Sequence, residues 1–346
     1  MSGKIMGLAV RSLATALCLC VGLCPVSAGP ALLFDAADGR VLYAEDPDDQ
    51  WHPASLTKVM TAYLTFEAIK QGKLTLESKI TCSEIASLQG PTKVGLPPGA
   101  SLTVESALHA LIIRSANDVA VMLAEAIAGS HEAFVEQMNA TAARLGMTRT
   151  RFANANGLPA PEQITTARDL ARLSSAVVHD YPQYAHMWSM VEARVGKRHL
   201  RTHNGLLTNY AGADGLKTGF ICDSGYNVVA SATRDGRKLI AVVLGERTGA
   251  ERSVRAANLL EHGFQTYAWK GLFEPQSLAT LPLAEDVKGP MTIRQIVRSY
   301  VCGTGGRRAV AKSKRKKGEA AVADQQKAPA KKKARKASAA AGQTQQ

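Results

Sequence analysis

Residues 53–58 read Pro-Ala-Ser-Leu-Thr-Lys, and they open a run, residues 59–69, whose apolar side chains recur at helical spacing. Ser55 is a typical helix-start residue, so we expect it in the first turn, where backbone N–H groups lack partners. Lys58 follows one turn later on the same helix face. A lysine can activate a serine only if burial or a second cation lowers its pKa. Taken alone, the pattern is better explained by a capping serine and a solvated lysine, so the assignment depends on further motifs.

A second motif, Ser115-Ala116-Asn117, follows an apolar-periodic helix expected over residues 104–114. A hydroxyl and an amide at a helix-to-loop junction can both point into one cleft. The Ser115 hydroxyl could pass a proton between the lysine and a leaving amine, and the Asn117 amide could hold a substrate peptide group. The alternative for this motif is simple helix capping.

The third motif, Lys-Thr-Gly, begins at Lys217 on a predicted strand. Lys217 provides the second cation that the helical lysine needs, and the Thr218 hydroxyl can donate to a substrate carboxylate. Gly219 lets a substrate backbone approach the strand. The Phe220 N–H can join the Ser55 N–H as an oxyanion hole.

These three motifs occur in the order found in penicillin-binding proteins and class A β-lactamases. Residues 30–270 resemble the low-molecular-mass penicillin-binding proteins that act as serine-type D-Ala-D-Ala carboxypeptidases. The stretches that carry the resemblance are residues 55–63, 113–118, 215–219 and 225–232. Peptidoglycan stem peptides are then the implied substrates, and β-lactam antibiotics the implied covalent inhibitors.

The resemblance also implies a role for each motif residue. The implied roles are acylated nucleophile for Ser55, base for Lys58, proton relay for Ser115, substrate alignment for Asn117, binding of the terminal carboxylate for Lys217 and Thr218, and a further carboxylate-facing group for Arg252.

Other enzymes share parts of this site. A D,D-endopeptidase uses the same residues on a crosslinked donor. A class A β-lactamase needs a deacylating glutamate on a loop, but Glu136 falls in a predicted helix and Glu162 lacks the accompanying asparagine. A non-catalytic cell-wall-binding protein would have lost Ser55, Lys58 or Lys217, and all three are present.

The fold class predicted from the pattern of elements is α+β, an antiparallel sheet flanked by helices with an inserted helical lobe. A hairpin at residues 31–44 precedes the lobe, and strand-like periodicity returns after residue 213. The predicted helices span residues 104–114, 118–128, 131–145, 166–179 and 250–269, and the predicted later strands span 215–221, 226–233 and 238–244. This catalytic domain, residues 29–270, is followed by a short appendage, residues 271–306, with one or two strands and a helix near 293–301.

The first 28 residues have the basic start, apolar centre and small-residue cleavage site of a signal peptide. The protein is therefore expected to be exported and periplasmic or otherwise extracytoplasmic. After cleavage three cysteines remain, which allow at most one disulfide within the chain. These are Cys82, Cys222 and Cys302, of which we expect Cys222 to be a packed thiol near the cleft.

The net charge of +13 is concentrated in the tail, residues 307–346, which carries 13 Lys/Arg and 2 Asp/Glu. With a further two basic residues in the signal peptide, residues 29–306 are neutral. The tail has too few large apolar residues to fold, so we expect it to be disordered and to contact anionic membrane or wall polymer. Nucleic acid is an unlikely partner for an exported chain without aromatic residues between the lysines.

The sequence predicts neither a metal nor a cofactor. His199 and His203 are spaced as in zinc proteases, but Leu200 stands where the motif requires glutamate. Many relatives follow the catalytic domain with a β-rich domain and a membrane-binding helix, and residues 271–306 show neither pattern.

Overall fold

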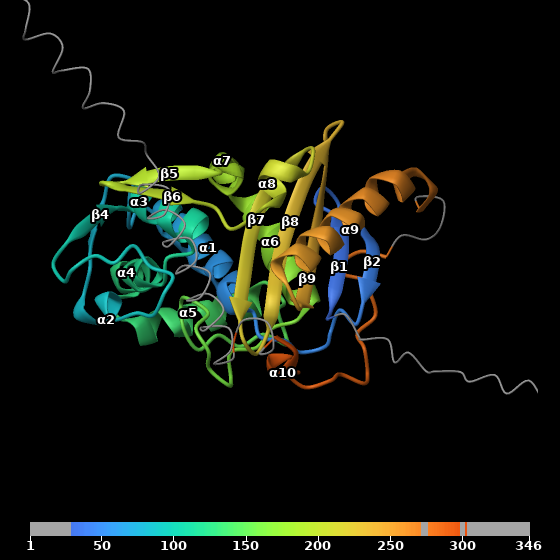
Figure 1. The fold of residues 1–346 in the computed structure, drawn as a ribbon, viewed down its shortest axis with the longest axis horizontal. Coiled ribbons are helices and arrows are strands. Elements are labelled where there is room, and N and C mark those ends of the chain that lie inside the picture. Colours follow the sequence, from blue (N-terminus) through green and yellow to red (C-terminus); the bar gives the residue numbers. More distant parts are fainter. Residues whose placement is uncertain (1–28, 271–275, 298–301, 303–346) are drawn as a thin grey trace, which may run out of the picture.

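A five-stranded antiparallel sheet stands beside a helical lobe in the computed structural model, which describes residues 29–270, 276–297 and Cys302 of the 346-residue chain (Figure 1). The strands pair in the order β2-β1-β9-β8-β7. Their bounds are β1 (Ala31–Asp35), β2 (Val41–Glu45), β7 (Ala213–Ile221), β8 (Gly225–Arg234) and β9 (Arg237–Glu246). The predicted α+β class is confirmed, as are the hairpin at residues 31–44 and the three later strands.

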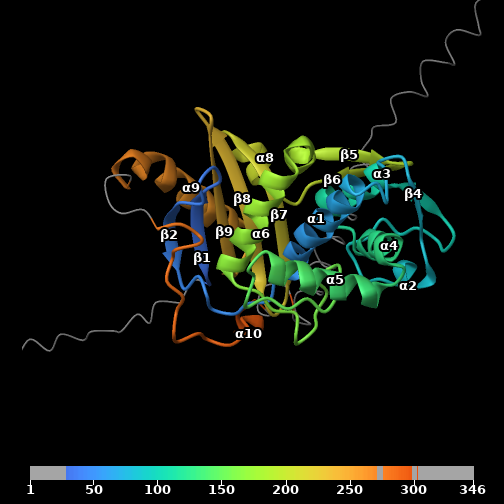
Figure 2. The ribbon, with the colours of Figure 1, turned by 180° about the vertical axis from the view of Figure 1, so that it is seen from behind.

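Both faces of the sheet are buried, because side chains alternate across each strand. In β1, Leu32 and Phe34 join the core shared with the helical lobe, while Ala31 and Leu33 join a second core under α9 (Gly249–Lys270). Helix α9 packs along β8, β9, β1 and β2, and α6 (Ala167–Asp180) packs on the opposite face (Figures 1 and 2). The sheet therefore forms the middle of three layers.

The helical lobe is inserted between β2 and β7. It contains the 3₁₀ turn η1 (Ala54–Leu56), α1 (Thr57–Lys70), β3 (Lys79–Thr81), α2 (Glu84–Ser87), β4 (Ser101–Thr103), α3 (Val104–His109), the π-helical turn η2 (Ala110–Arg114), α4 (Asn117–Ala128) and α5 (His131–Arg144). The return to the sheet passes through α6, η3 (Pro182–Tyr184), α7 (Ala185–Ser189), β5 (Glu192–Val195), β6 (Arg198–Arg201) and α8 (Leu206–Asn209).

Helices α5 and α6 each begin directly after a residue whose side chain caps the first turn. The Ser130 hydroxyl accepts from the backbone N–H of Ala133 at the start of α5, and Thr166 does the same for Asp169 in α6. The helix predicted over residues 104–114 is present as α3 followed by η2, and it ends because Ser115 adopts the left-handed conformation.

The described part of the segment after α9 contains the predicted short helix but not the predicted strands. Between residues 276 and 297 the described chain holds the short helix α10 (Arg294–Val297) and an isolated bridge from Arg40 to Ser277, but no strand. Cys222 is not a free packed thiol, because it forms a disulfide with Cys302, while Cys82 is free and buried. The two cysteines can pair because the chain after α9 returns to the turn between β7 and β8, where Cys222 lies.

Two predicted segments, the signal peptide at residues 1–28 and the basic tail at residues 307–346, lie outside the described residues. Among the described residues, no helix combines the length and apolarity needed to cross a bilayer.

Candidate active site

Ser55 lies in the 3₁₀ turn η1, directly ahead of α1, and Lys58 lies in the first turn of α1. The Lys58 Nζ is 3.0 Å from the Ser55 Oγ. Ala54, next to the serine, has a φ of +49°, a strained conformation for a residue with a Cβ. The serine and lysine are therefore paired as predicted, on a turn whose backbone is held in place by its surroundings.

The ammonium group of Lys58 is almost completely buried, with 1% of the residue exposed. It also contacts the Asn117 Oδ1 at 2.7 Å and the Asn156 carbonyl oxygen at 2.5 Å. Burial, followed by the charge of Lys217, lowers the pKa of Lys58 well below its ordinary value, against an opposing effect of Asp118. This lowering favours the neutral amine of Lys58, which is the form that a general base must have.

The Ser115-Ala116-Asn117 motif joins η2 to α4, and Asn117 is the first residue of α4. Ser115 has φ +61° and ψ +40°, and its buried Oγ has no hydrogen-bond partner. A buried unpaired hydroxyl is costly unless a ligand satisfies it. The Asn117 side chain accepts from Lys58 and donates to the Gly90 carbonyl at 2.9 Å. The motif thus presents one unsatisfied hydroxyl and one oriented amide beside the serine.

The buried carboxylate of Asp118 holds the wall of the cleft beside this motif. Its two oxygens accept from the backbone N–H groups of Val94 and Gly95 at 3.0 and 2.7 Å. The same loop bonds to the motif itself, since the Thr92 hydroxyl donates to the Ser115 carbonyl at 3.0 Å. The neighbouring residues Pro91 and Thr92 line the cavity described below.

The Lys-Thr-Gly motif lies on β7, an edge strand of the sheet that runs past η1. Lys217 is buried, and burial with the charge of Arg252 lowers its pKa to about 7. A Cβ on Gly219 would lie 3.0 Å from the Pro53 oxygen and 3.2 Å from the Ser55 nitrogen. The backbone that approaches Gly219 most closely is therefore that of the serine's own turn.

The motif residues surround a cavity of about 370 Å³. Its lining residues are Ser55, Pro91, Thr92, Ser115, Asn117, Gly157, Leu158, His203, Thr218, Gly219, Phe220, Ile221, Tyr226 and Arg252. Arg252 extends from α9, is 7% exposed, and donates to the His203 carbonyl at 3.4 Å. Burial lowers the pKa of Arg252 to about 10, and its Nε has no hydrogen-bond partner. Every predicted site residue except Lys58 and Lys217 lines the cavity, and those two lie buried behind it.

The sequence analysis did not identify a further part of the site, the loop of residues 154–158. The Asn156 carbonyl accepts from Lys58, and the Asn156 side chain donates to Gln89 at 2.8 Å. Gly157 has a φ of +81° and packs against the carbonyl of Ala54. The Asn-Gly pair was an available signal, because it indicates a turn with positive φ.

Two glutamates considered for deacylation lie away from the cavity. Glu136 is exposed on α5, and Glu162 is exposed in the loop before α6. His199 is 3.1 Å from the Glu192 carboxylate on the β5–β6 hairpin, while His203 lies at the cavity. Trp51 is buried, and its indole N–H donates to the Ser224 carbonyl at 3.0 Å, so it supports the site without lining it.

A sheet with an inserted helical lobe, and a serine paired with a buried lysine at their junction, define a serine peptidase of the penicillin-binding type. The structures similar to this chain agree. They include penicillin binding protein 6B from Escherichia coli, with 37% identity and a TM-score of 0.66 over 69% of this chain and 77% of that one. Penicillin-Binding Protein D2 from Listeria monocytogenes in the cefotaxime-bound form has 32% identity and a TM-score of 0.63, covering 68% of this chain and 97% of that one.

The family model described as D-alanyl-D-alanine carboxypeptidase matches residues 21–248. The chain belongs to this family. It is 38% identical over 249 residues to the D-alanyl-D-alanine carboxypeptidase DacC of Escherichia coli, covering 70% of this chain and 62% of that protein. It is 34% identical over 253 residues to DacF of Bacillus subtilis, covering 70% of this chain and 64% of that protein. The chain therefore spans somewhat less than two thirds of the length of these relatives.

Proposed function

We propose that this protein is a serine-type D-alanyl-D-alanine carboxypeptidase that removes the terminal D-Ala from peptidoglycan stem pentapeptides. The observation that carries the proposal is the buried amino group of Lys58, whose Nζ is 3.0 Å from the Ser55 Oγ and whose pKa is lowered by burial and by Lys217. This pairing turns an ordinary hydroxyl into a nucleophile. A capping serine with a solvated lysine would need neither the burial nor the second cation.

In the proposed reaction, neutral Lys58 takes the Ser55 proton as Oγ attacks the carbonyl of the penultimate D-Ala. The backbone N–H groups of Ser55 and Phe220 would stabilise the oxyanion, because both residues line the cavity where the carbonyl must lie. The Ser115 Oγ, which is buried and has no hydrogen-bond partner, would pass the proton on to the leaving amine. Water then releases the shortened peptide from Ser55.

The terminal carboxylate of the substrate would lie between Thr218, Lys217 and Arg252. The Thr218 hydroxyl and the Arg252 guanidinium line the cavity, and the Lys217 charge lies behind them. An arriving carboxylate raises the pKa of Lys217, because an opposite charge favours the protonated form. The Asn117 amide would align the peptide group beside them. A penicillin carries a carboxylate next to a reactive carbonyl, so it would acylate Ser55 in the same way.

The test compares two reactions of the same purified full-length protein. We expect release of D-Ala from a stem pentapeptide to exceed penicillin hydrolysis, with no release from the matched tetrapeptide. Ser55→Ala serves as the control and is expected to be inactive in both assays. Turnover of penicillin faster than D-Ala release would instead indicate a β-lactamase. Preferential cleavage of a crosslinked dimer would indicate a D,D-endopeptidase.

We also propose that the protein acts outside the cytoplasm and that the basic tail, residues 307–346, contacts anionic membrane or wall polymer. The support is the sequence, which places a net charge of +11 on these 40 residues. Binding to anionic vesicles is expected to fall steeply with salt and to disappear when the chain is truncated after Gly306. Salt-independent binding by the truncated protein would contradict this proposal.

A further inference from the structure

The chain that follows α9 runs back along the catalytic domain as a strap, which we define as residues 276–297. It starts beside the turn between β1 and β2, where Val41 donates to the Gln276 carbonyl at 2.8 Å. Leu278 then donates to the Gly39 carbonyl at 2.9 Å. From there the strap passes to α10, which lies near the ends of β8 and β9 (Figure 1). Beyond its start it makes two further sets of contacts, and each lies next to a different half of the active site.

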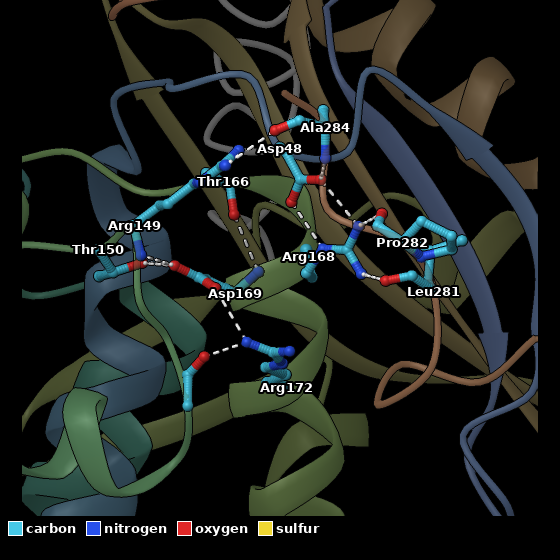
Figure 3. Close-up of polar contacts among 11 residues, drawn as sticks. Asp48, Arg149, Thr150, Thr166, Arg168, Asp169, Arg172, Leu281, Pro282 and Ala284 are labelled. Carbon is cyan, nitrogen blue, oxygen red and sulfur yellow. Dashed lines mark hydrogen bonds and ion pairs between the residues drawn. The ribbon is translucent and has the colours of Figure 1, made fainter. Parts of the chain in front are cut away.

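The first set of contacts holds the chain that leads to the nucleophile, residues 47–53. Arg168 and Asp48, each 1% exposed, form a two-point ion pair at 2.6 and 2.8 Å (Figure 3). The Arg168 guanidinium also donates to two strap carbonyls, those of Leu281 and Pro282, at 2.8 and 2.7 Å. One buried guanidinium therefore joins the strap to the approach of the Ser55 turn.

Further bonds extend this contact toward the serine. The Ala284 N–H donates to the Asp48 carboxylate at 3.0 Å, and the Lys288 N–H donates to Asp49 at 3.1 Å. The Gln50 N–H in turn donates to the Lys288 carbonyl at 3.0 Å. This pairing ends next to Trp51, whose indole N–H bonds to the turn between β7 and β8.

The second set of contacts holds that turn itself. The Asp223 carboxylate accepts two bonds from Arg294, both at 2.6 Å, and the Asp223 carbonyl accepts from Ile293 at 3.0 Å. The neighbouring Cys222 forms the disulfide with Cys302, which lies five positions after the last residue of the strap in the sequence. The turn begins two residues after Phe220, and the intervening residue lines the cavity.

We infer that the strap positions the oxyanion hole by fixing the separation between its two donors, the N–H groups of Ser55 and Phe220, and that the Cys222–Cys302 disulfide makes this positioning redox-sensitive. The inference rests on the proposed function, which assigns those two donors. The donors lie on separate elements, η1 and β7, and the strap is bonded to the chain beside each of them. Small displacements matter, because misplacing reacting groups by about 1 Å can cost about 100-fold in rate.

Reduction would release the strap at one end only. A dithiol supplies two electrons and two protons, is itself oxidised to a disulfide, and leaves free thiols on Cys222 and Cys302. At that end the contact then depends on the Arg294–Asp223 pair, whose side chains are 53% and 22% exposed, and on the hydrogen bonds from Thr292 and Ile293 to Asp223. Exposed ion pairs hold weakly. The buried Arg168–Asp48 pair remains, so the domain stays folded while the turn after Phe220 gains freedom.

The experiment measures acylation of the full-length protein by a fluorescent penicillin, separating the dissociation constant of the first complex from the acylation rate constant. We expect Cys302→Ser to lower the rate constant about tenfold with little change in the dissociation constant. Dithiothreitol should bring the wild type to the same value and leave Cys302→Ser unchanged. Cys82→Ser, which removes the free buried thiol, is the matched control and should respond to dithiothreitol like the wild type.

A rate constant unaffected by both dithiothreitol and Cys302→Ser would overturn the inference, even if the melting temperature fell. If Cys302→Ser does not fold, reduction of the folded wild type and the Arg294→Gln variant provide the same comparison. A wild type that is never acylated would overturn the proposed function instead, so the two failures are distinct.

Discussion

Gly157→Ala is expected to impair acylation of Ser55 although residue 157 carries no reactive group. A Cβ at this position would lie 1.9 Å from the Ala54 carbonyl oxygen and 3.0 Å from the Ser55 nitrogen. Because Cβ atoms essentially never come closer than 3.0 Å to such atoms, the Ala54 carbonyl must move by about 1.1 Å. A displacement of that size at the nucleophile's turn predicts a loss of about 100-fold in the acylation rate.

The matched control is Gly129→Ala. Gly129 has a φ of +83°, close to the +81° of Gly157, but a Cβ there would meet nothing within 4 Å. Both variants place an alanine in the left-handed conformation, which lowers the free energy of unfolding by about 1–2 kcal/mol. Only Gly157→Ala also displaces the backbone at Ser55. Acylation by labelled penicillin and urea unfolding should be measured on both proteins. Equal acylation rates in the two variants would refute this reasoning.

The remaining predictions concern charged groups. Lys58→Arg keeps a cation but removes the base, so mass spectrometry should find no penicillin adduct on this variant. Lys217→Arg should keep partial acylation. Normal acylation of Lys58→Arg would rule Lys58 out as the base. Between the folded pKa of Lys217, about 7, and its ordinary value, the unfolded chain binds more protons. The free energy of unfolding should therefore rise with pH across that window, by up to about 1.4 kcal/mol per pH unit. If Lys217→Met had the same dependence of unfolding free energy on pH as the wild type, the lowered pKa of Lys217 would be contradicted. Arg168→Leu leaves the Asp48 carboxylate buried without its ion-pair partner and should lower the free energy of unfolding in urea by about 3–5 kcal/mol. The double variant Asp48→Leu/Arg168→Leu should recover part of this loss. An Arg168→Leu protein as stable as the wild type would contradict the importance of this pair.

The three motifs could be predicted from the sequence because each combines a reactive side chain with a strong local pattern. Ser55 lies in the turn directly ahead of α1 and Lys58 in its first turn, Ser115 follows a periodic helix, and Lys217 lies on the strand β7. The long elements were predictable for the same reason. The two-stranded sheets β3–β4 and β5–β6 were not, because strands of three or four residues contain too little alternation to be recognised.

The missed parts of the site act through the backbone or through distant pairing. Asn156 contacts Lys58 with its backbone carbonyl, and Gly157 contributes by lacking a side chain. The role of each therefore cannot be predicted from its residue type. The strap likewise bonds to Arg168 through carbonyl groups. The Cys222–Cys302 pairing depends on where the chain goes after α9, which periodicity does not encode.

The cluster of cations at the cleft has a consequence for turnover. Arg252 lines the cavity, Lys217 lies behind it, and none of the cavity-lining residues that the structure describes is acidic. In the resting protein this positive charge faces a space without a matching anion. Any small carboxylate that fits can occupy it, including the D-alanine that the proposed reaction sets free. Inhibition by the product and stabilisation of the fold by simple carboxylates would then both measure the same property. That property is the affinity of the positively charged cavity for a carboxylate.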